Sequence, residues 1–147
     1  MIRKLCMALV LSTLSVLAIA AEHTVQMKNS GVDGIMVFEP GFLKVAVGDT
    51  VHFEPTDAGH NSESVAGLIP AGATSWKSDL TKKASVKIDK DGVYVYVCSP
   101  HSMLAMVGVI VAGNPTNLAD IKKNVAPLNA KFSMNKDRLN MYLAKVK

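Results

Sequence analysis

The sequence has little cysteine, little histidine and little excess charge, and these shortages narrow its possible functions. Of its 147 residues, two are cysteine and four are histidine. A structural zinc site needs more of these residues close together than the chain supplies. A formal net charge of +4 is too small for the dense basic surface of a nucleic-acid-binding protein. The chain also has no internal repeat and no low-complexity stretch.

The first twenty residues have the composition of a secretory signal. Two positive charges in Met1–Lys4 precede a weakly polar to apolar run, Leu5–Ala20, which ends in the small-x-small pattern Ala-Ile-Ala. The run is too short for a comfortable bilayer span, and no stop-transfer charges follow it directly. We therefore expect residues 1–20 to be a cleaved signal peptide, with Ala21 as the first residue of the exported protein. An uncleaved membrane anchor is the alternative.

Cleavage would change both the charge and the cysteine count. The exported chain would carry 14 basic and 12 acidic residues, a balance compatible with a weakly steered encounter with an acidic protein surface. Cys6 would leave with the signal, and its place before the apolar run does not suit a lipoprotein anchor. Cys98 would then be a single thiol in a compartment that oxidises thiols, so it needs to be buried or to bind a ligand.

The remaining chain, 21–147, suits one domain with a strand-rich body, roughly 22–112, and a helical tail, about 115–147. Short apolar or alternating segments separated by Gly, Pro and Asp predict six or seven strands. Such a series is typical of an antiparallel sandwich or barrel. The clearest predicted strands are His23–Met27, Leu43–Val47, Thr50–Phe53, Val86–Ile88, Val93–Val97 and Val107–Ala112.

The tail changes from the period of strands to that of helices. A first helix is predicted after a cap at Asn114 or Thr116, and it ends at Pro127. A second is predicted after a cap at Ser133. We expect both to pack over the sandwich, a partner-binding appendage being the alternative. The apolar faces comprise Leu118, Ile121 and Val125 in the first helix, and Leu139, Leu143 and Val146 in the second.

The segment from Cys98 to Met106, Cys-Ser-Pro-His-Ser-Met-Leu-Ala-Met, carries the most chemical information. It lies between two predicted strands, and in a loop of this length a thiolate, the imidazole of His101 and a thioether can converge on one point. A second imidazole can come from His60, in Gly-His-Asn after the strand that ends near Pro55. Two imidazoles and a thiolate with a weak axial thioether suit copper electron transfer.

Other interpretations of these residues remain open. Taken singly, Cys98 could be a small buried hydrophobe and His60 a turn residue. The Cys-x2-His pair could be a catalytic dyad, although no third group or oxyanion signature accompanies it. A copper oxidase would need further histidine pairs, and only His23 and His52 remain, isolated on predicted strands. A copper carrier, which favours Met-rich or exposed sites, is the second hypothesis, because the chain has eight methionines.

The spacing Cys98-x2-His101-x4-Met106, with His60-Asn61 upstream, resembles the type 1 copper site of the cupredoxins. The resemblance to the pseudoazurins within that family covers nearly the whole exported chain. It implies a mostly β, cupredoxin-type Greek-key sandwich or barrel with two short C-terminal helices. It also implies a soluble, monomeric, periplasmic blue copper electron carrier that is not an enzyme. The motifs that carry it are Met36-Val-Phe-Glu-Pro, Gly48-Asp-Thr, Gly59-His-Asn-Ser-Glu-Ser and Ile69-Pro-Ala-Gly.

The resemblance also implies roles for individual residues. One copper ion, alternating between Cu(I) and Cu(II), would be held by two imidazoles, a thiolate and an axial thioether. Asn61 would orient its loop and hydrogen-bond the thiolate, Pro100 would stiffen the loop, and Met36 would pack beside the exposed ligand. The implied ligands are His60, Cys98, His101 and Met106.

Electrons would pass by outer-sphere transfer at the exposed edge of His101, inside an apolar patch. Ala58 and Val97 occupy positions where the family often has lysine, so we expect weaker steering of acidic partners. Those partners would be periplasmic redox proteins, namely the copper nitrite reductase of denitrification and c-type cytochromes, in transient complexes. The expected patch comprises Ile35, Pro100, Met103, Leu104 and Ala105, and the expected lysine ring comprises Lys28 and Lys77, with Lys131 and Lys136 as weaker candidates.

Overall fold

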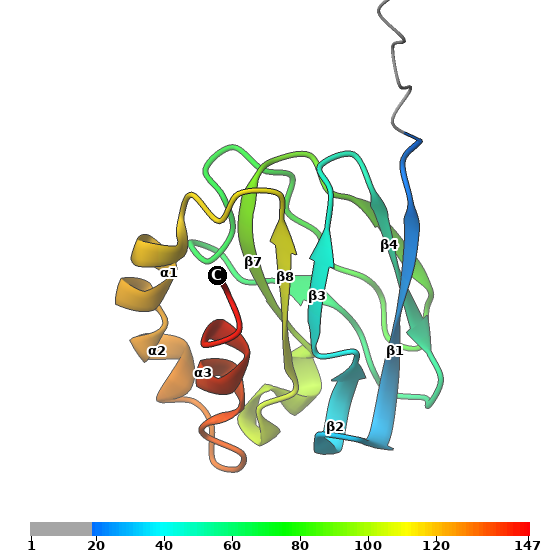
Figure 1. Ribbon diagram of the computed structural model, residues 1–147. Helices are drawn as coiled ribbons and strands as arrows, with labels where there is room; N and C mark the ends of the chain where they lie inside the picture. Colours follow the sequence, from blue (N-terminus) through cyan, green and yellow to red (C-terminus); the bar gives the residue numbers. More distant parts are fainter. Residues whose placement is uncertain (1–18) are drawn as a thin grey trace, which may run out of the picture.

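Eight strands, one 3-10 helix and three short α-helices make up residues 19–147, the part of the chain that this computed structural model describes (Figure 1). Most of the predicted signal peptide, residues 1–18, lies outside the described residues. The strands are β1 Glu22–Gly31, β2 Gly34–Glu39, β3 Phe42–Val45, β4 Thr50–Pro55, β5 Glu63–Ser64, β6 Ala84–Lys87, β7 Gly92–Val97 and β8 Val107–Ala112. The 3-10 helix η1 is Ser99–Leu104, and the α-helices are α1 Leu118–Asn124, α2 Ala126–Asn129 and α3 Arg138–Leu143.

The strands form two four-stranded sheets, in the orders β2-β1-β4-β6 and β3-β8-β7-β5. This confirms the mostly β sandwich that the sequence predicts. The sheets are mixed and not purely antiparallel, because β1 pairs with β4 and β3 pairs with β8 in parallel. Short strands β2 and β5 were not among the clearest predictions. Pairings between distant segments leave no local pattern in the sequence, so periodicity alone could not assign their direction.

Strands β7 and β8 are buried along their whole length. Alternate residues of β7 face two different apolar clusters. Val95 lies in a cluster with the helices, whereas Tyr96 lies in a cluster shared with β1 and β4. Figure 1 shows the helices on the side of β7 and β8 away from β1 and β4. This double burial explains why both strands are nearly continuous apolar runs.

The tail differs in detail from the predicted pair of helices. Pro127 lies in the first turn of α2, where its missing N–H is tolerated, so it begins a helix there. Ser133 does not cap a helix. Its backbone N–H donates to the carbonyl of Met103 at 2.8 Å, and α3 begins only at Arg138. The apolar face of the tail does pack over the sandwich, since Leu139 is fully buried against β7 and β8.

The link between β7 and β8 contains η1 and lies at one end of the sandwich. Beside it in Figure 1 are the β1–β2 turn and the loop that joins α2 to α3. The beginning of β1 lies at the opposite end. Within residues 19–147, no helix has both the length and the apolar character needed to cross a bilayer.

Candidate metal centre

Three of the four predicted ligands come from the link between β7 and β8. Cys98 follows the last residue of β7, His101 lies in η1, and Met106 precedes β8. The antiparallel register pairs Val97 with Val107, so the two sulfur-bearing residues lie opposite each other. The N–H of Cys98 donates to the carbonyl of Met106 at 3.0 Å, and the N–H of Met106 donates to the carbonyl of His101 at 3.2 Å. Hydrogen bonds thus close the link into a compact loop.

The fourth residue, His60, reaches this loop from the link between β4 and β5. Its Nδ1 lies 3.7 Å from Cys98 Sγ and 3.1 Å from His101 Nδ1, and the remaining Nδ1–Sγ distance is 3.4 Å. Among residues 19–147, these three form the one group of three or more potential His, Cys, Asp or Glu ligands that can hold a metal ion, with ligand atoms within 4.8 Å. Met106 is fully buried in the same cluster as Cys98.

The outward nitrogen of His60 is held by Asn29, near the end of β1. Nε2 lies 3.0 Å from Asn29 Oδ1, an oxygen that only accepts hydrogen bonds, so the ring proton sits on Nε2. Nδ1 therefore presents its lone pair to the sulfur and to the second imidazole. Burial, reinforced by the nearby imidazole of His101, lowers the pKa of His60, which favours the neutral, coordinating form. Sequence reasoning missed Asn29, and no motif around it signals this role.

The sulfur of Cys98 is buried and accepts a main-chain hydrogen bond. The backbone N–H of Asn61 points at Sγ from 3.5 Å. Burial raises the pKa of the Cys98 thiol, so a metal ion that binds the thiolate must displace the proton. The contact expected between Asn61 and the sulfur is therefore made by its main chain.

The side chain of Asn61 joins the two ligand-bearing segments. Its Oδ1 accepts the N–H of Ser99 at 2.8 Å, and its Nδ2 donates to Ser99 Oγ at 3.1 Å and to the carbonyl of Ser78 at 3.2 Å. Pro100 follows in the first turn of η1. Met36 is half-buried against the cluster that contains the two sulfur ligands.

The predicted apolar patch around His101 needs one correction. Ile35 is 45% exposed and Met103 is 63% exposed, while His101 and Leu104 are half-buried. Ala105 was expected in the patch, and that expectation is wrong because the residue is fully buried. It has a left-handed backbone with φ of 55° and packs in the cluster on the helix side of β7 and β8.

The two main lysines of the expected ring have carboxylate neighbours. Lys28 Nζ lies 2.5 Å from Glu39 Oε2, and Lys77 Nζ lies 3.2 Å from Glu63 Oε2. Each pair is largely neutral at a distance, so these lysines contribute less to long-range steering than unpaired ones would.

The donor set fits copper. Two imidazole nitrogens and a cysteine sulfur, with a buried thioether beside them and no carboxylate in the group, suit a soft or borderline metal. Hard cations such as Mg²⁺ and Ca²⁺ need oxygen ligands. The residues of this chain therefore match the cofactor that the sequence resemblance implies.

Comparison with known proteins agrees with this chemistry. The family model for copper binding proteins of the plastocyanin/azurin family matches residues 25–113. A pseudoazurin relative from Rhizobium leguminosarum bv. viciae is 48% identical over 140 residues, which cover 95% of this chain and 88% of the relative. A pseudoazurin from Methylorubrum extorquens is 43% identical over 108 residues, 74% of this chain and 73% of its own. The crystal structure of native pseudoazurin from Hyphomicrobium denitrificans is 42% identical, with a TM-score of 0.77, and covers 86% of this chain and 98% of its own.

Proposed function

This chain belongs to the pseudoazurins, within the plastocyanin/azurin family of copper-binding proteins, and on that premise we propose how it carries electrons. Copper is the cofactor of the family, and its pseudoazurins are blue copper electron carriers. The proposed ligands are His60, Cys98, His101 and Met106. The observation that carries the assignment is the convergence of two Nδ1 atoms and one Sγ within 4.8 Å.

The residues around the ligands hold them in one arrangement. When bound, copper supplies a one-electron couple between Cu(I) and Cu(II). Asn29 fixes the ring of His60, and Asn61 ties the segment of His60 to the loop of Cys98. Because these contacts fix the ligands in the folded chain, little has to move when the charge changes. A small rearrangement between oxidation states favours fast electron transfer.

The exposed edge of His101 is the proposed point of exchange. Of the proposed ligands, His101 is half-buried, whereas His60, Cys98 and Met106 are fully buried. Ile35 and Met103, the exposed apolar side chains of the expected patch, would let a partner approach this edge without an ordered water layer. Transfer there is outer-sphere, so the chain makes and breaks no bond.

The proposed partners are redox proteins that meet this patch briefly, the copper nitrite reductase of denitrification and c-type cytochromes. A small net charge and paired lysines support weak steering of such partners, and weak contact suits a carrier that must leave again. Association rates that do not depend on ionic strength would agree with this surface.

We further propose export to the periplasm after cleavage between Ala20 and Ala21, which leaves one domain over 21–147. The N–H of Ala21 donates to Asp49 Oδ1 at 2.8 Å. Cleavage of the peptide bond between Ala20 and Ala21 would turn the amide of Ala21 into an ammonium group. This new terminus would form an ion pair with the carboxylate of Asp49, in place of the present hydrogen bond. N-terminal sequencing of the exported protein tests the position.

The decisive experiment is the visible spectrum of the protein loaded with Cu(II) and then reduced with ascorbate. We expect an intense thiolate-to-copper band that bleaches on reduction and returns on reoxidation. A colourless protein that binds only Cu(I) would contradict the electron-carrier assignment and would indicate a copper carrier. The full burial of three of the four proposed ligands argues against that alternative, since copper carriers use exposed and flexible ligands.

A further inference from the structure

The loop between α2 and α3 binds the ligand loop through consecutive carbonyl groups. Four donors of this tail segment, residues 133–138, meet the three consecutive carbonyls that directly precede Met106. No other residue separates the last acceptor from this proposed ligand. The bonds run from the N–H groups of Ser133 and Met134 to Met103 O at 2.8 and 3.4 Å, from Asn135 Nδ2 to Leu104 O at 3.2 Å and from Arg138 Nη1 to Ala105 O at 2.8 Å.

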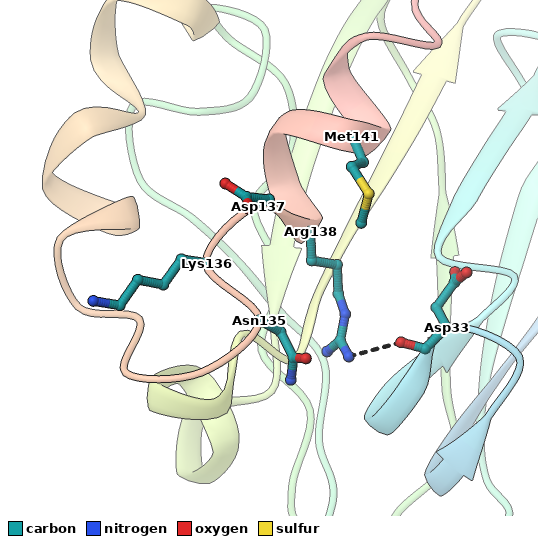
Figure 2. A pocket seen from close by; sticks show the side chains of 6 residues that line it. All are labelled: Asp33, Asn135, Lys136, Asp137, Arg138 and Met141. Carbon is teal, nitrogen blue, oxygen red and sulfur yellow. Dashed lines mark hydrogen bonds between the residues drawn. The ribbon is translucent and has the colours of Figure 1, made fainter.

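Arg138, the first residue of α3, is 2% exposed and donates to four carbonyls in all. Besides Ala105, it donates from Nη1 to the carbonyl of Met36 at 2.9 Å, and from Nη2 to those of Asp33 at 3.0 Å and Ile35 at 3.1 Å. Figure 2 shows the side chain extending from α3 to the main chain of Asp33. Its guanidinium therefore joins three segments that are far apart in the sequence.

The acceptors of this guanidinium are all main-chain carbonyls. The nearby carboxylate of Asp33 instead accepts a hydrogen bond from the hydroxyl group of Tyr142 at 2.7 Å. Burial of a charged group is unfavourable unless its donors are satisfied, and the planar fork of arginine can satisfy several carbonyls at once. The position of the side chain is thereby fixed by two loops and not by an ion pair with one residue.

Two of these acceptors have an unusual backbone. Met36 and Ala105 have φ of 48° and 55°, the left-handed region that residues with a side chain rarely adopt. Such conformations persist where the surroundings determine them. Both residues place their carbonyls on the same Nη1 of Arg138. The left-handed turn at Ala105 ends η1 and directs the chain into Met106.

We propose that Arg138 is a positioning residue for the copper site. It holds Ala105 in the turn that brings the thioether of Met106 to the metal, and it holds Met36 against the same cluster. The helical tail then helps to position the metal ligands, in addition to packing over the sheet. This inference rests on the proposed function, because it concerns the placement of a residue proposed to bind copper.

The test compares Arg138→Met and Arg138→Lys with Tyr142→Phe, all in the full chain loaded with copper. Tyr142→Phe is the matched control, since it removes a hydrogen bond of the same helix and leaves the ligand-loop carbonyls bonded. Copper affinity is measured by chelator competition, together with the visible spectrum, the EPR spectrum and the reduction potential. Unfolding of the copper-free variants records any general loss of stability separately.

For Arg138→Met we expect about 10- to 100-fold weaker copper binding, the range typical for loss of a group that orients a metal ligand. We also expect a changed ratio of the two main thiolate–copper absorption bands and a shifted potential. Arg138→Lys should fall between it and the unsubstituted protein, and Tyr142→Phe should leave all three properties unchanged.

Unchanged spectra, potential and affinity in a less stable Arg138→Met would show a merely structural role and overturn the inference. If that variant does not fold, Arg138→Lys decides in the same way, because lysine keeps the positive charge but cannot bond all four carbonyls at once. If the unsubstituted protein lacks the blue band, the proposed function fails first and the inference fails with it.

Discussion

The two ends of the sandwich each contain a histidine whose Nε2 meets an oxygen, and only one of them belongs to a metal site. At the ligand end, Nε2 of His60 meets the amide oxygen of Asn29 at 3.0 Å. At the other end, where β1 begins (Figure 1), Nε2 of His23 lies 2.8 Å from a carboxylate oxygen of Asp49. A neutral acceptor fixes the ring of His60 and adds no charge, whereas the carboxylate of Asp49 places a negative charge beside the ring of His23.

The other ring nitrogen, Nδ1, also distinguishes His60 from His23. In His60 it faces Cys98 and another imidazole, and the group contains no carboxylate. Among residues 19–147, His23 belongs to no such group. The surroundings of a histidine, and not its presence on a strand or in a loop, therefore distinguish a ligand from a structural residue. The following changes test this distinction, in order of decreasing expected effect.

Removal of the thiolate should abolish the blue site. Cys98→Ser replaces a soft ligand by a hydroxyl that binds copper weakly, so we expect complete loss of the intense visible band. His23→Phe at the opposite end should retain the full spectrum and serves as the control. An intense band in Cys98→Ser would mean that another residue supplies the sulfur.

The partner of His60 should affect copper binding next most strongly. Asn29→Leu removes the acceptor that orients the ring, and we expect about 10- to 100-fold weaker affinity by chelator competition. Asn29→Asp makes the ligand end resemble the His23 end. A carboxylate acceptor increases the electron density of the ring, so the blue band should remain while the reduction potential falls. Equal affinities in Asn29→Leu and a Ser30→Leu control would remove Asn29 from the site.

The axial position should tune the site without emptying it. In Met106→Gln an amide oxygen replaces the thioether, and oxygen stabilises Cu(II) relative to Cu(I). The variant should therefore bind copper with a lower reduction potential by voltammetry. Unchanged voltammetry would show that Met106 is not a ligand.

At the other end, Asp49 should contribute pH-dependent stability and nothing to the metal site. The hydrogen bond from His23, with the amides of Ala46 and Ala21, lowers the pKa of Asp49 from 3.8 to about 2. A carboxylate with a lowered folded-state pKa stabilises the fold above its unfolded pKa, and this contribution is lost as the pH falls through the folded pKa. Asp49→Asn should thus unfold at lower temperature at neutral pH, and the difference should shrink between pH 3.8 and about 2.

The absorption spectrum of copper-loaded Asp49→Asn at neutral pH should match that of the unsubstituted protein. A change in that spectrum would show that Asp49, at the opposite end of the sandwich, affects the copper site.

The smallest effect should come from surface charge. Glu39→Gln leaves Lys28 without its paired carboxylate and should accelerate electron transfer to an acidic redox protein less than about threefold at low ionic strength. The acceleration should vanish at high salt, as stopped-flow kinetics can show. Lys28→Gln in the same background is the control, and a gain that persists in it would exclude steering by this lysine.

The sequence predicts those parts of the site that depend on local spacing. The loop from Cys98 to Met106 contains three potential metal ligands that only have to converge within one turn region. Their role in binding a metal can therefore be predicted from the sequence. The structure brings two of them together with His60 and buries the third in the same cluster. The mostly β class could be predicted for a similar reason, since alternation and turn residues are local signals.

Long-range contacts account for what could not be predicted. Asn29 and His60 are 31 positions apart, and Arg138 and Met36 are 102 positions apart. Neither contact leaves a periodic pattern in the sequence. The burial of Ala105 depends on the same tail contact, so a small residue in a ligand loop was wrongly placed at the surface. The parallel pairings of β1 with β4 and β3 with β8 likewise depend on how distant segments meet.

The parallel pairing of β3 with β8 shows how far apart in the sequence the segments are that must meet before the fold around the site is complete. It places Phe42 opposite Val109, so much of the chain must be gathered before this pair closes. Sheets built from such distant pairs fold in about milliseconds to seconds, far more slowly than local structure. The local pairing of β7 with β8 already places Cys98 opposite Met106, whereas His60 reaches them from a segment 38 positions before Cys98 and completes the site only when the two sheets have come together. The complete set of proposed copper ligands therefore forms late in folding, and until then the thiol of Cys98 is exposed to oxidation.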